Sequence, residues 1–143
     1  MTNEIAKFRF AGFSIRKSAI EIKNHNAIAP NMSLNLDLAG EHIVNECRYN
    51  LYMKVGVQDK SKSVKANIEV IGYYEFDNDC KEQELSDYFY INAPAILFPY
   101  VRAYLATLST LSGLSNPIMI PTMNLTKFAV QLKENTTARY LKS

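Results

Sequence analysis

Two histidines are the residues in this sequence best suited to act as a general base, but their surroundings do not complete a catalytic site. His25 lies in a polar connection and His42 follows a turn, while no serine stands in a G-x-S-x-G context. The five glycines are scattered and form neither a phosphate-binding loop nor a dinucleotide fingerprint. We therefore expect a protein that is not an enzyme and binds no cofactor.

Metal binding is the next chemistry to consider, because acids gather between positions 77 and 87 and two cysteines are present. Cys47 and Cys80 have no C-x-x-C partner and no histidine at ligand spacing, so we interpret both as buried thiols. The acids do not have the spacing of a calcium-binding loop; they are Asp77, Asp79, Glu82, Glu84 and Asp87. The sequence thus predicts a solvated acidic loop and no metal site.

RNA binding is an alternative because aromatic and basic residues alternate near the N-terminus. Phe8, Phe10 and Phe13 could stack on bases, and basic residues surround them at Arg9, Arg16, Lys17 and Lys23. No RNP or KH motif accompanies them, and aromatic residues of a first strand belong more often to a core. We expect no nucleic-acid partner and keep an RNA-binding module as the less favoured alternative.

Length and composition describe one ordinary globular domain. The chain has 143 residues, 48% hydrophobic and 21% charged, with a net charge of +2 that indicates no partner. No signal-like segment opens it, and no apolar run approaches the ~20 residues that span a bilayer. We expect a single domain over residues 1–143, cytoplasmic and without membrane insertion, whose tail is mobile after about residue 134.

Four segments alternate apolar and polar residues, which is typical of half-buried strands. The first covers residues 8–22 and changes phase near Gly12, as a strand with a β-bulge would. The second covers residues 34–38 and ends at Gly40, the third covers 47–57, and a polar turn at 58–63 leads to the fourth at 64–70. Short polar links predict an antiparallel sheet with one solvated face.

Two helices should cover the other face. Pro99 suits a first helical turn and Gly113 a C-terminal stop, which predicts a helix over residues 99–112. A shorter helix begins near Asn124. We therefore expect an α+β fold, a four-stranded antiparallel sheet with two C-terminal helices packed on one face. The first helix carries more apolar surface than one small sheet needs to cover, which predicts an oligomer interface at Val101, Tyr104, Leu105, Leu108 and Leu111.

The segment between these helices, residues 114–123, is apolar although its sequence resembles a turn. Pro117 and Pro121 exclude an ordinary helix, yet the segment carries Ile118, Met119, Ile120 and Met123. Two interpretations stay open. The segment is either a packed connector or one wall of a groove, in which unbranched methionine supplies an adaptable surface.

Two ordered motifs resemble the SecB export chaperones. The run N-A-P-A-I-L-F-P-Y-V-R at residues 92–102 is similar to the run N-x-P-x-I-L-F-P-Y-x-R that opens the long helix of that family. The run I-P-T-M-N-L at residues 120–125 follows where the family has L-x-P-[V/I]-N-F. The resemblance covers residues 8–133, although only the two motifs are specific.

The resemblance implies a homotetramer, arranged as a dimer of dimers, that binds unfolded or precursor polypeptides in long apolar grooves without ATP. In that family the grooves are lined by the connection between the first two strands, by the inter-helix loop and by the second helix. The corresponding residues of this sequence are Ile28, Met32, Ile118, Met119, Ile120, Met123, Leu125 and Phe128.

The sequence departs from the family in its charges. Members that deliver clients to the SecA motor present acids on the outer sheet face, where Glu21 and Glu69 can stand, but Lys17 occupies a position that is usually acidic. The C-terminal tail is also basic, with Arg139 and Lys142. The resemblance therefore implies an export chaperone or, alternatively, a SecB-like chaperone dedicated to the antitoxin of a toxin–antitoxin system.

Overall fold

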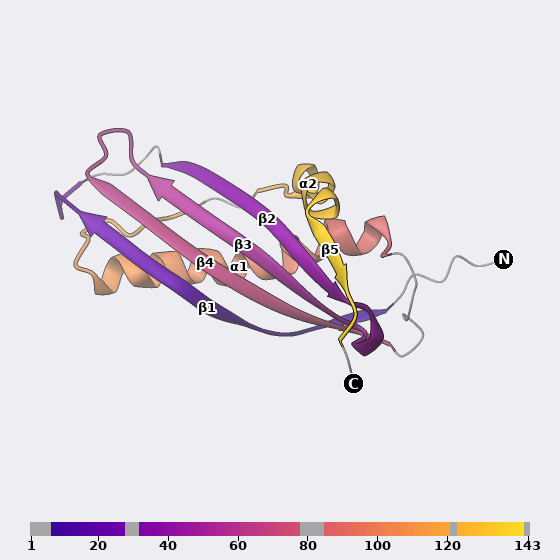
Figure 1. Ribbon diagram of the computed structural model, residues 1–143. Helices are drawn as coiled ribbons and strands as arrows, with labels where there is room; N and C mark the ends of the chain where they lie inside the picture. The colour runs from indigo at the N-terminus through magenta and orange to yellow at the C-terminus, as the bar shows by residue number, and fades with distance from the viewer. Residues whose placement is uncertain (1–6, 28–31, 78–84, 121–122, 142–143) are drawn as a thin grey trace.

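The computed structural model describes residues 7–27, 32–77, 85–120 and 123–141, in which a long twisted sheet carries one long helix along one face (Figure 1). The helices are α1 (Asp87–Leu111) and α2 (Ala129–Glu134), with short 3-10 turns η1 (Val44–Glu46) and η3 (Thr126–Phe128). The strands are β1 (Phe8–Ile22), β2 (Ser33–Ile43), β3 (Arg48–Gln58), β4 (Val64–Phe76) and β5 (Thr136–Arg139).

The sheet has five strands in the order β1-β4-β3-β2-β5, so the expectation of four strands is wrong. The first four strands are antiparallel as predicted, whereas β5 pairs with β2 in parallel and makes the sheet mixed. The prediction of an α+β fold with two helices is confirmed. The sequence predicted only a mobile tail where β5 lies, because its polar residues show no alternation of burial.

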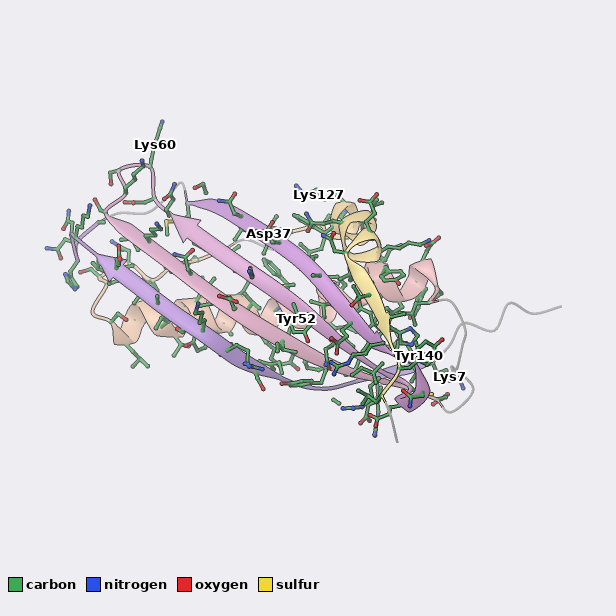
Figure 2. All side chains as sticks on the ribbon, viewed as in Figure 1. Lys7, Asp37, Tyr52, Lys60, Lys127 and Tyr140 are labelled. Carbon is green, nitrogen blue, oxygen red and sulfur yellow. The ribbon has the colours of Figure 1, made fainter. Side chains whose placement is uncertain are left out.

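The alternation of β3 and β4 places one apolar row against α1 and one polar row on the opposite face. Tyr49, Leu51 and Met53 are almost fully buried. Figure 2 shows Asp37 and Tyr52 on the face of the sheet turned to the viewer, away from α1. Both β2 and β4 continue beyond their predicted ends, to Ile43 and Phe76, because buried residues continue along them.

The predicted bulge in β1 is present. The pairing of β1 with β4 shifts between Phe10 and Gly12 and again between Ile15 and Lys17. Gly12 has a φ of 127°, a backbone conformation that residues with a Cβ rarely adopt. The two shifts let β1 keep its apolar side chains on the helix side over 15 residues.

Helix α1 begins at Asp87, not at Pro99, and both Pro94 and Pro99 lie inside it. The Ser86 side chain caps its start by accepting a hydrogen bond from the Phe89 N–H at 3.2 Å. Each proline removes a helical hydrogen bond, at a cost of about 3 kcal/mol. The helix continues because residues at intervals of four bury against the sheet, each contributing about 1.5–3 kcal/mol when large and apolar; they are Phe89, Ala93, Leu97, Val101 and Leu105.

The first turn of α1 is held by an aromatic cluster. The ring of Phe89 lies 4.7 Å from that of Tyr49, 4.9 Å from that of Phe76 and 5.0 Å from that of Phe8, measured between centroids. These residues come from three strands, so the start of the helix depends on contacts that are distant in sequence.

Strand β5 and the residues that follow it are joined to β3 and η1 by side chains, in addition to the backbone pairing of β5 with β2. The Asn45 side chain donates to the Leu141 carbonyl and accepts from the Leu141 N–H. The Tyr49 hydroxyl lies 2.6 Å from Thr136 Oγ1, and Thr136 donates its own hydroxyl proton to the Leu132 carbonyl. The buried tyrosine is therefore the donor to Thr136.

Cys47 is disulfide-bonded, so its interpretation as a buried thiol is wrong. The side chain is 5% exposed and follows η1 with a φ of 52°. Spacing could not reveal the bond, because the fold and not the sequence interval decides which cysteines meet. Cys80 lies outside the described residues.

His42 makes the stability of the fold depend on pH. Its side chain is 5% exposed beside the rings of Tyr49 and Phe76, its Nε2 has no hydrogen-bond partner among the described residues, and burial lowers its pKa below the usual value of about 6.5. Below that value the unfolded chain binds a proton that the folded chain resists, so stability falls as pH falls.

We therefore expect the urea midpoint to fall between pH 7.5 and pH 5.5, with part of the loss due to the protonation of His42 on unfolding. A His42→Leu variant should lose less stability over the same interval. An equal loss in both proteins would show that other groups cause the acid sensitivity.

Candidate functional site

The inter-helix segment leaves α1 and turns back onto the connection that follows β1. Gly113, with a φ of 88°, ends the helix as predicted. The Ser115 N–H then donates to the His25 carbonyl at 2.9 Å, and the Ser115 hydroxyl donates to Asn26 Oδ1 at 2.9 Å. The structure thus brings together two of the segments that were predicted to line a groove.

Two polar side chains of α1 fix the path of the segment along the helix. The hydroxyl of Ser109, fully buried, accepts a hydrogen bond from the Ile118 N–H at 2.8 Å and donates to the Ala106 carbonyl. The Arg102 Nε donates to the Ile120 carbonyl at 2.9 Å. Residues 118–120 are therefore anchored beside α1 at both ends.

This conformation separates the three predicted groove residues of the segment. Ile118 is fully buried and Ile120 is 7% exposed, while Met119 between them is 73% exposed. Ile118 and Ile120 therefore serve the core, as in the packed-connector interpretation, and Met119 serves the surface. A hollow of about 230 Å³ lies between these residues and the outer side of α1, at Pro99, Arg102, Ala103 and Ala106.

The other predicted groove residues lie just before β2 or in the stretch that leads into α2, and most of them are partly exposed. Met32, Met123 and Phe128 are half-buried against the core, and Leu125 is 5% exposed. The side chain of Gln131, one turn after Phe128, bonds to the Leu38 N–H and ties α2 to β2. Ile28 lies outside the described residues. Sequence reasoning missed Gln131, whose role has no local signal.

The predicted interface residues of α1 also divide into buried residues and residues that reach the surface. Val101 and Leu105 are buried in the core of the protomer, so they are not available to another copy. Tyr104 and Leu108 are half-buried, and Tyr104 donates to the Ser18 hydroxyl on β1 at 2.7 Å. Leu111 is 83% exposed. The apolar surface that α1 leaves open also includes Tyr100, at 45% exposure.

The two acids predicted to contact a translocation motor both face cations. Glu69 lies 3.7 Å from Lys17 Nζ, and Glu21 stands opposite Lys65 in the pairing of β1 with β4. Both are exposed enough for solvent to weaken these attractions. The outer face nevertheless presents a mixed charge at the positions where the resemblance implies a negative one.

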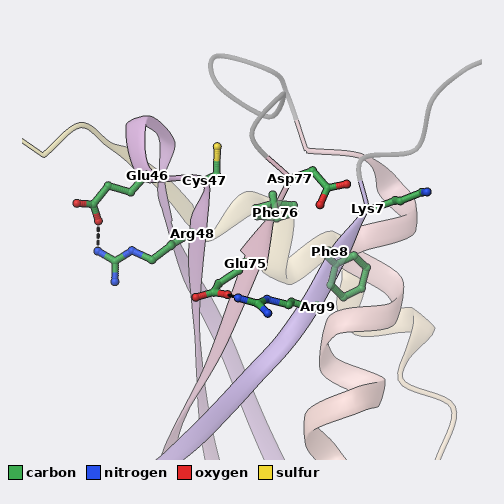
Figure 3. Close-up of a pocket in the computed structure, with 9 residues that line it drawn as sticks. All are labelled: Lys7, Phe8, Arg9, Glu46, Cys47, Arg48, Glu75, Phe76 and Asp77. Carbon is green, nitrogen blue, oxygen red and sulfur yellow. Dashed lines mark hydrogen bonds and ion pairs between the residues drawn. The ribbon is translucent and has the colours of Figure 1, made fainter.

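A larger hollow, of about 490 Å³, opens at the end of the sheet near η1 (Figure 3). Arg9 is ion-paired with Glu75 and Arg48 with Glu46, while Lys7 and Asp77 add one charge of each sign. Because its charges balance, the hollow selects neither anions nor cations. In the described ranges no group of side chains could hold a metal ion, and no helix is long and apolar enough to cross a membrane.

The chain is similar to a known family and to solved structures. Residues 5–135 match the family described as "Preprotein translocase subunit SecB". No curated protein matches the chain.

Two solved structures share the fold. The SecB-like chaperone Rv1957 of Mycobacterium tuberculosis, in complex with a ChAD peptide from the Rv1956 HigA1 antitoxin, is 16% identical with a TM-score of 0.65, over 81% of this chain and 90% of that one. A protein of unknown function from Streptococcus agalactiae is 8% identical with a TM-score of 0.50, over 82% of this chain and 98% of that one.

Proposed function

Because the chain belongs to the SecB family, we propose that it is an ATP-independent holdase that binds non-native polypeptides in an apolar groove. The observation that carries the proposal is the set of exposed and half-exposed apolar side chains around β2, α2 and the inter-helix segment, namely Met32, Met119, Met123 and Phe128. Three of the four are methionines, whose flexible side chains adapt to clients of different shape.

Energetics favour several such grooves acting together. Burial of one client leucine or phenylalanine contributes about 1.5–3 kcal/mol, while ordering each client residue costs about 1–2 kcal/mol. One short groove therefore binds weakly. A homotetramer would offer a single client several grooves, and the resulting avidity needs no sequence code. We propose this assembly, as a dimer of dimers, for the present chain.

The clients that we propose first are precursor polypeptides on the export route, held in the cytoplasm before translocation. Nothing in the proposed mechanism requires catalysis or a cofactor.

An antitoxin of a toxin–antitoxin system is the second candidate client, and one observation favours it. Lys17 beside Glu69, and Lys65 opposite Glu21, reduce the negative charge of the outer face. Charge at such a surface acts mainly on encounter and partner choice, so docking to a basic motor would be weakened. Pull-down from the native cell distinguishes the two: one small antitoxin-like protein, without SecA or envelope precursors, would support this second candidate.

The function is tested with a heat-labile client whose aggregation is followed by light scattering. We expect the protein to suppress scattering at stoichiometric amounts without ATP, and a Met119→Ser variant to bind the client about fivefold more weakly, since it loses part of one side chain's burial. Its melting temperature should be unchanged because Met119 is exposed.

Tyr140→Ser is the matched control, since Tyr140 is also exposed but lies in the tail after β5. It should bind the client as the unchanged protein does. If the folded protein fails to protect several clients, the holdase proposal is wrong. If both substitutions weaken client binding equally, Met119 does not line the groove.

A further inference from the structure

The outer edge of β2 is closed along only part of its length. At its middle, the Leu38 N–H donates to Gln131 Oε1 at 2.9 Å and the Leu38 carbonyl accepts from Asn135 Nδ2 at 3.1 Å. The Gly40 N–H then donates to the Asn135 carbonyl, and β5 pairs with residues 40–43. Even-numbered residues of β2 therefore present their backbone groups away from β3.

The same orientation applies to Leu34 and Leu36. The pairing of β2 with β3 has no register shift from Ser33 to Ile43, and alternate residues of a strand face the same edge. Among the residues that the structure describes, the outward N–H and C=O groups of Leu34 and Leu36 have no hydrogen-bond partner. The first part of β2 is thus an open sheet edge, and Figure 1 shows β5 beside only the later part of the strand.

Apolar side chains flank this open edge. Met32 and Leu34 are half-buried at the start of β2. Phe128, also half-buried, lies one turn before Gln131, which is bonded to Leu38. A polypeptide seated in the proposed groove would therefore pass close to unpaired backbone groups.

We infer that the open edge of β2, residues 33–37, is a strand-addition site for extended segments of client polypeptide. The inference rests on the proposed function and adds how the client is held: main-chain hydrogen bonds to Leu34 and Leu36, with alternate client side chains on the apolar side. Main-chain groups are the same in every sequence, so such a site needs no sequence code. Strand β5 already occupies the same edge in parallel further along, at residues 40–43.

A client segment fits this edge better than a second copy of the chain does. The open stretch offers the backbone groups of only two residues before the side chains of Gln131 and Asn135 close the edge at Leu38. A stable interface between copies buries about 1,200–2,000 Å² in total, which so short a strand pairing cannot provide. A short extended segment that binds and leaves repeatedly needs no more than this edge.

The direct test is residue-resolved amide hydrogen exchange of the whole protein with a ten-residue peptide of alternating valine and threonine flanked by lysines. At a peptide concentration of about ten times Kd, exchange at Leu34 and Leu36 should slow about tenfold. Exchange at Asn35 and Asp37 should not change, because their amides already face β3. Peptide binding without slower exchange at Leu34 and Leu36 would overturn the edge inference and leave the holdase intact.

A pair of substitutions at one position gives a second test. Leu34→Pro removes the outward N–H without removing a bond to β3, a placement that edge strands tolerate. Leu34→Ala removes a similar part of the side chain and keeps the N–H. The proline variant should bind the peptide about 2- to 10-fold more weakly than the alanine variant. Equal peptide affinities of the two variants would contradict strand addition. So would an unchanged protein that suppresses aggregation but does not bind the peptide. If the unchanged protein neither binds the peptide nor suppresses aggregation, the proposed function is wrong as well.

Discussion

A Gly40→Ala variant is expected to lose about 3 kcal/mol of folding free energy, because the added methyl group overlaps a fully buried tyrosine. A Cβ at position 40 would lie 1.8 Å from the hydroxyl oxygen of Tyr49 and 2.3 Å from its Cζ. Tyr49 is fully buried, and its displacement would also break the bond to Thr136 that holds β5. Against a total stability of about 5–15 kcal/mol for a domain, the loss is severe.

Gly56→Ala is the matched control for this substitution. Gly56 is also a strand glycine, but its nearest atom to an added Cβ is Asn67 Oδ1 at 3.2 Å, at the end of a flexible side chain. The folding free energy of the Gly56→Ala variant, obtained from urea unfolding followed by circular dichroism, should stay within about 1 kcal/mol of that of the unchanged protein. Adding Tyr49→Leu should cost less in the Gly40→Ala background than alone. Similar midpoints for the two alanine variants would contradict the steric account.

The core strands could be predicted from sequence because their burial alternates with the same period as their side chains. Residues 48–58 show this clearly, since every second residue is buried in β3. The bulge near Gly12 was also predictable, because an apolar pattern that changes phase at a glycine is typical of an extra residue in a strand.

The start of α1 could not be predicted from local rules. Pro94 and Pro99 each favour a helix that begins at or after them, and that preference gave the wrong boundary. The burial of Phe89 among rings of three strands outweighs it. Strand β5 was missed for a related reason, because its anchors, Asn45 and Tyr49, lie about 90 residues earlier in the chain.

For the candidate site, the family resemblance indicates which segments to expect in the groove, and the structure shows which of their side chains are exposed. Hydrogen bonds from Ser115 to His25 and Asn26 bring two of these segments together. The family pattern could not tell Met119 from its neighbours, because Ile118, Met119 and Ile120 are all apolar. Only the Ser109 and Arg102 contacts decide which side chain of the three points outward.

Substitution of Ala103 by glutamate should dissociate the proposed tetramer. From Tyr88 to Leu111, α1 carries no acidic side chain and only one basic one, Arg102, whose Nε bonds to Ile120. The solvent-facing side of α1 carries apolar residues. Ile91, Tyr100 and Leu111 are 37%, 45% and 83% exposed, and Ala95 and Ala103 are also exposed. A long helix face without charge is expected to be covered, and a second copy of the same helix would cover it with like chemistry.

If α1 faces solvent in a monomer, Ala103→Glu should change little, because glutamate forms helices well and exposed substitutions usually stay within about 0.5 kcal/mol. If two copies meet there, each new carboxylate is buried without a partner in an apolar contact, which costs several kcal/mol. We therefore expect sedimentation equilibrium to give four times the chain mass of 16.2 kDa for the unchanged protein and a smaller assembly for the variant. Asn67→Glu, on the opposite face of the sheet, is the control and should sediment as the unchanged protein does. A monomer at micromolar concentration before any substitution would contradict the proposed assembly, and with it the avidity on which weak grooves depend.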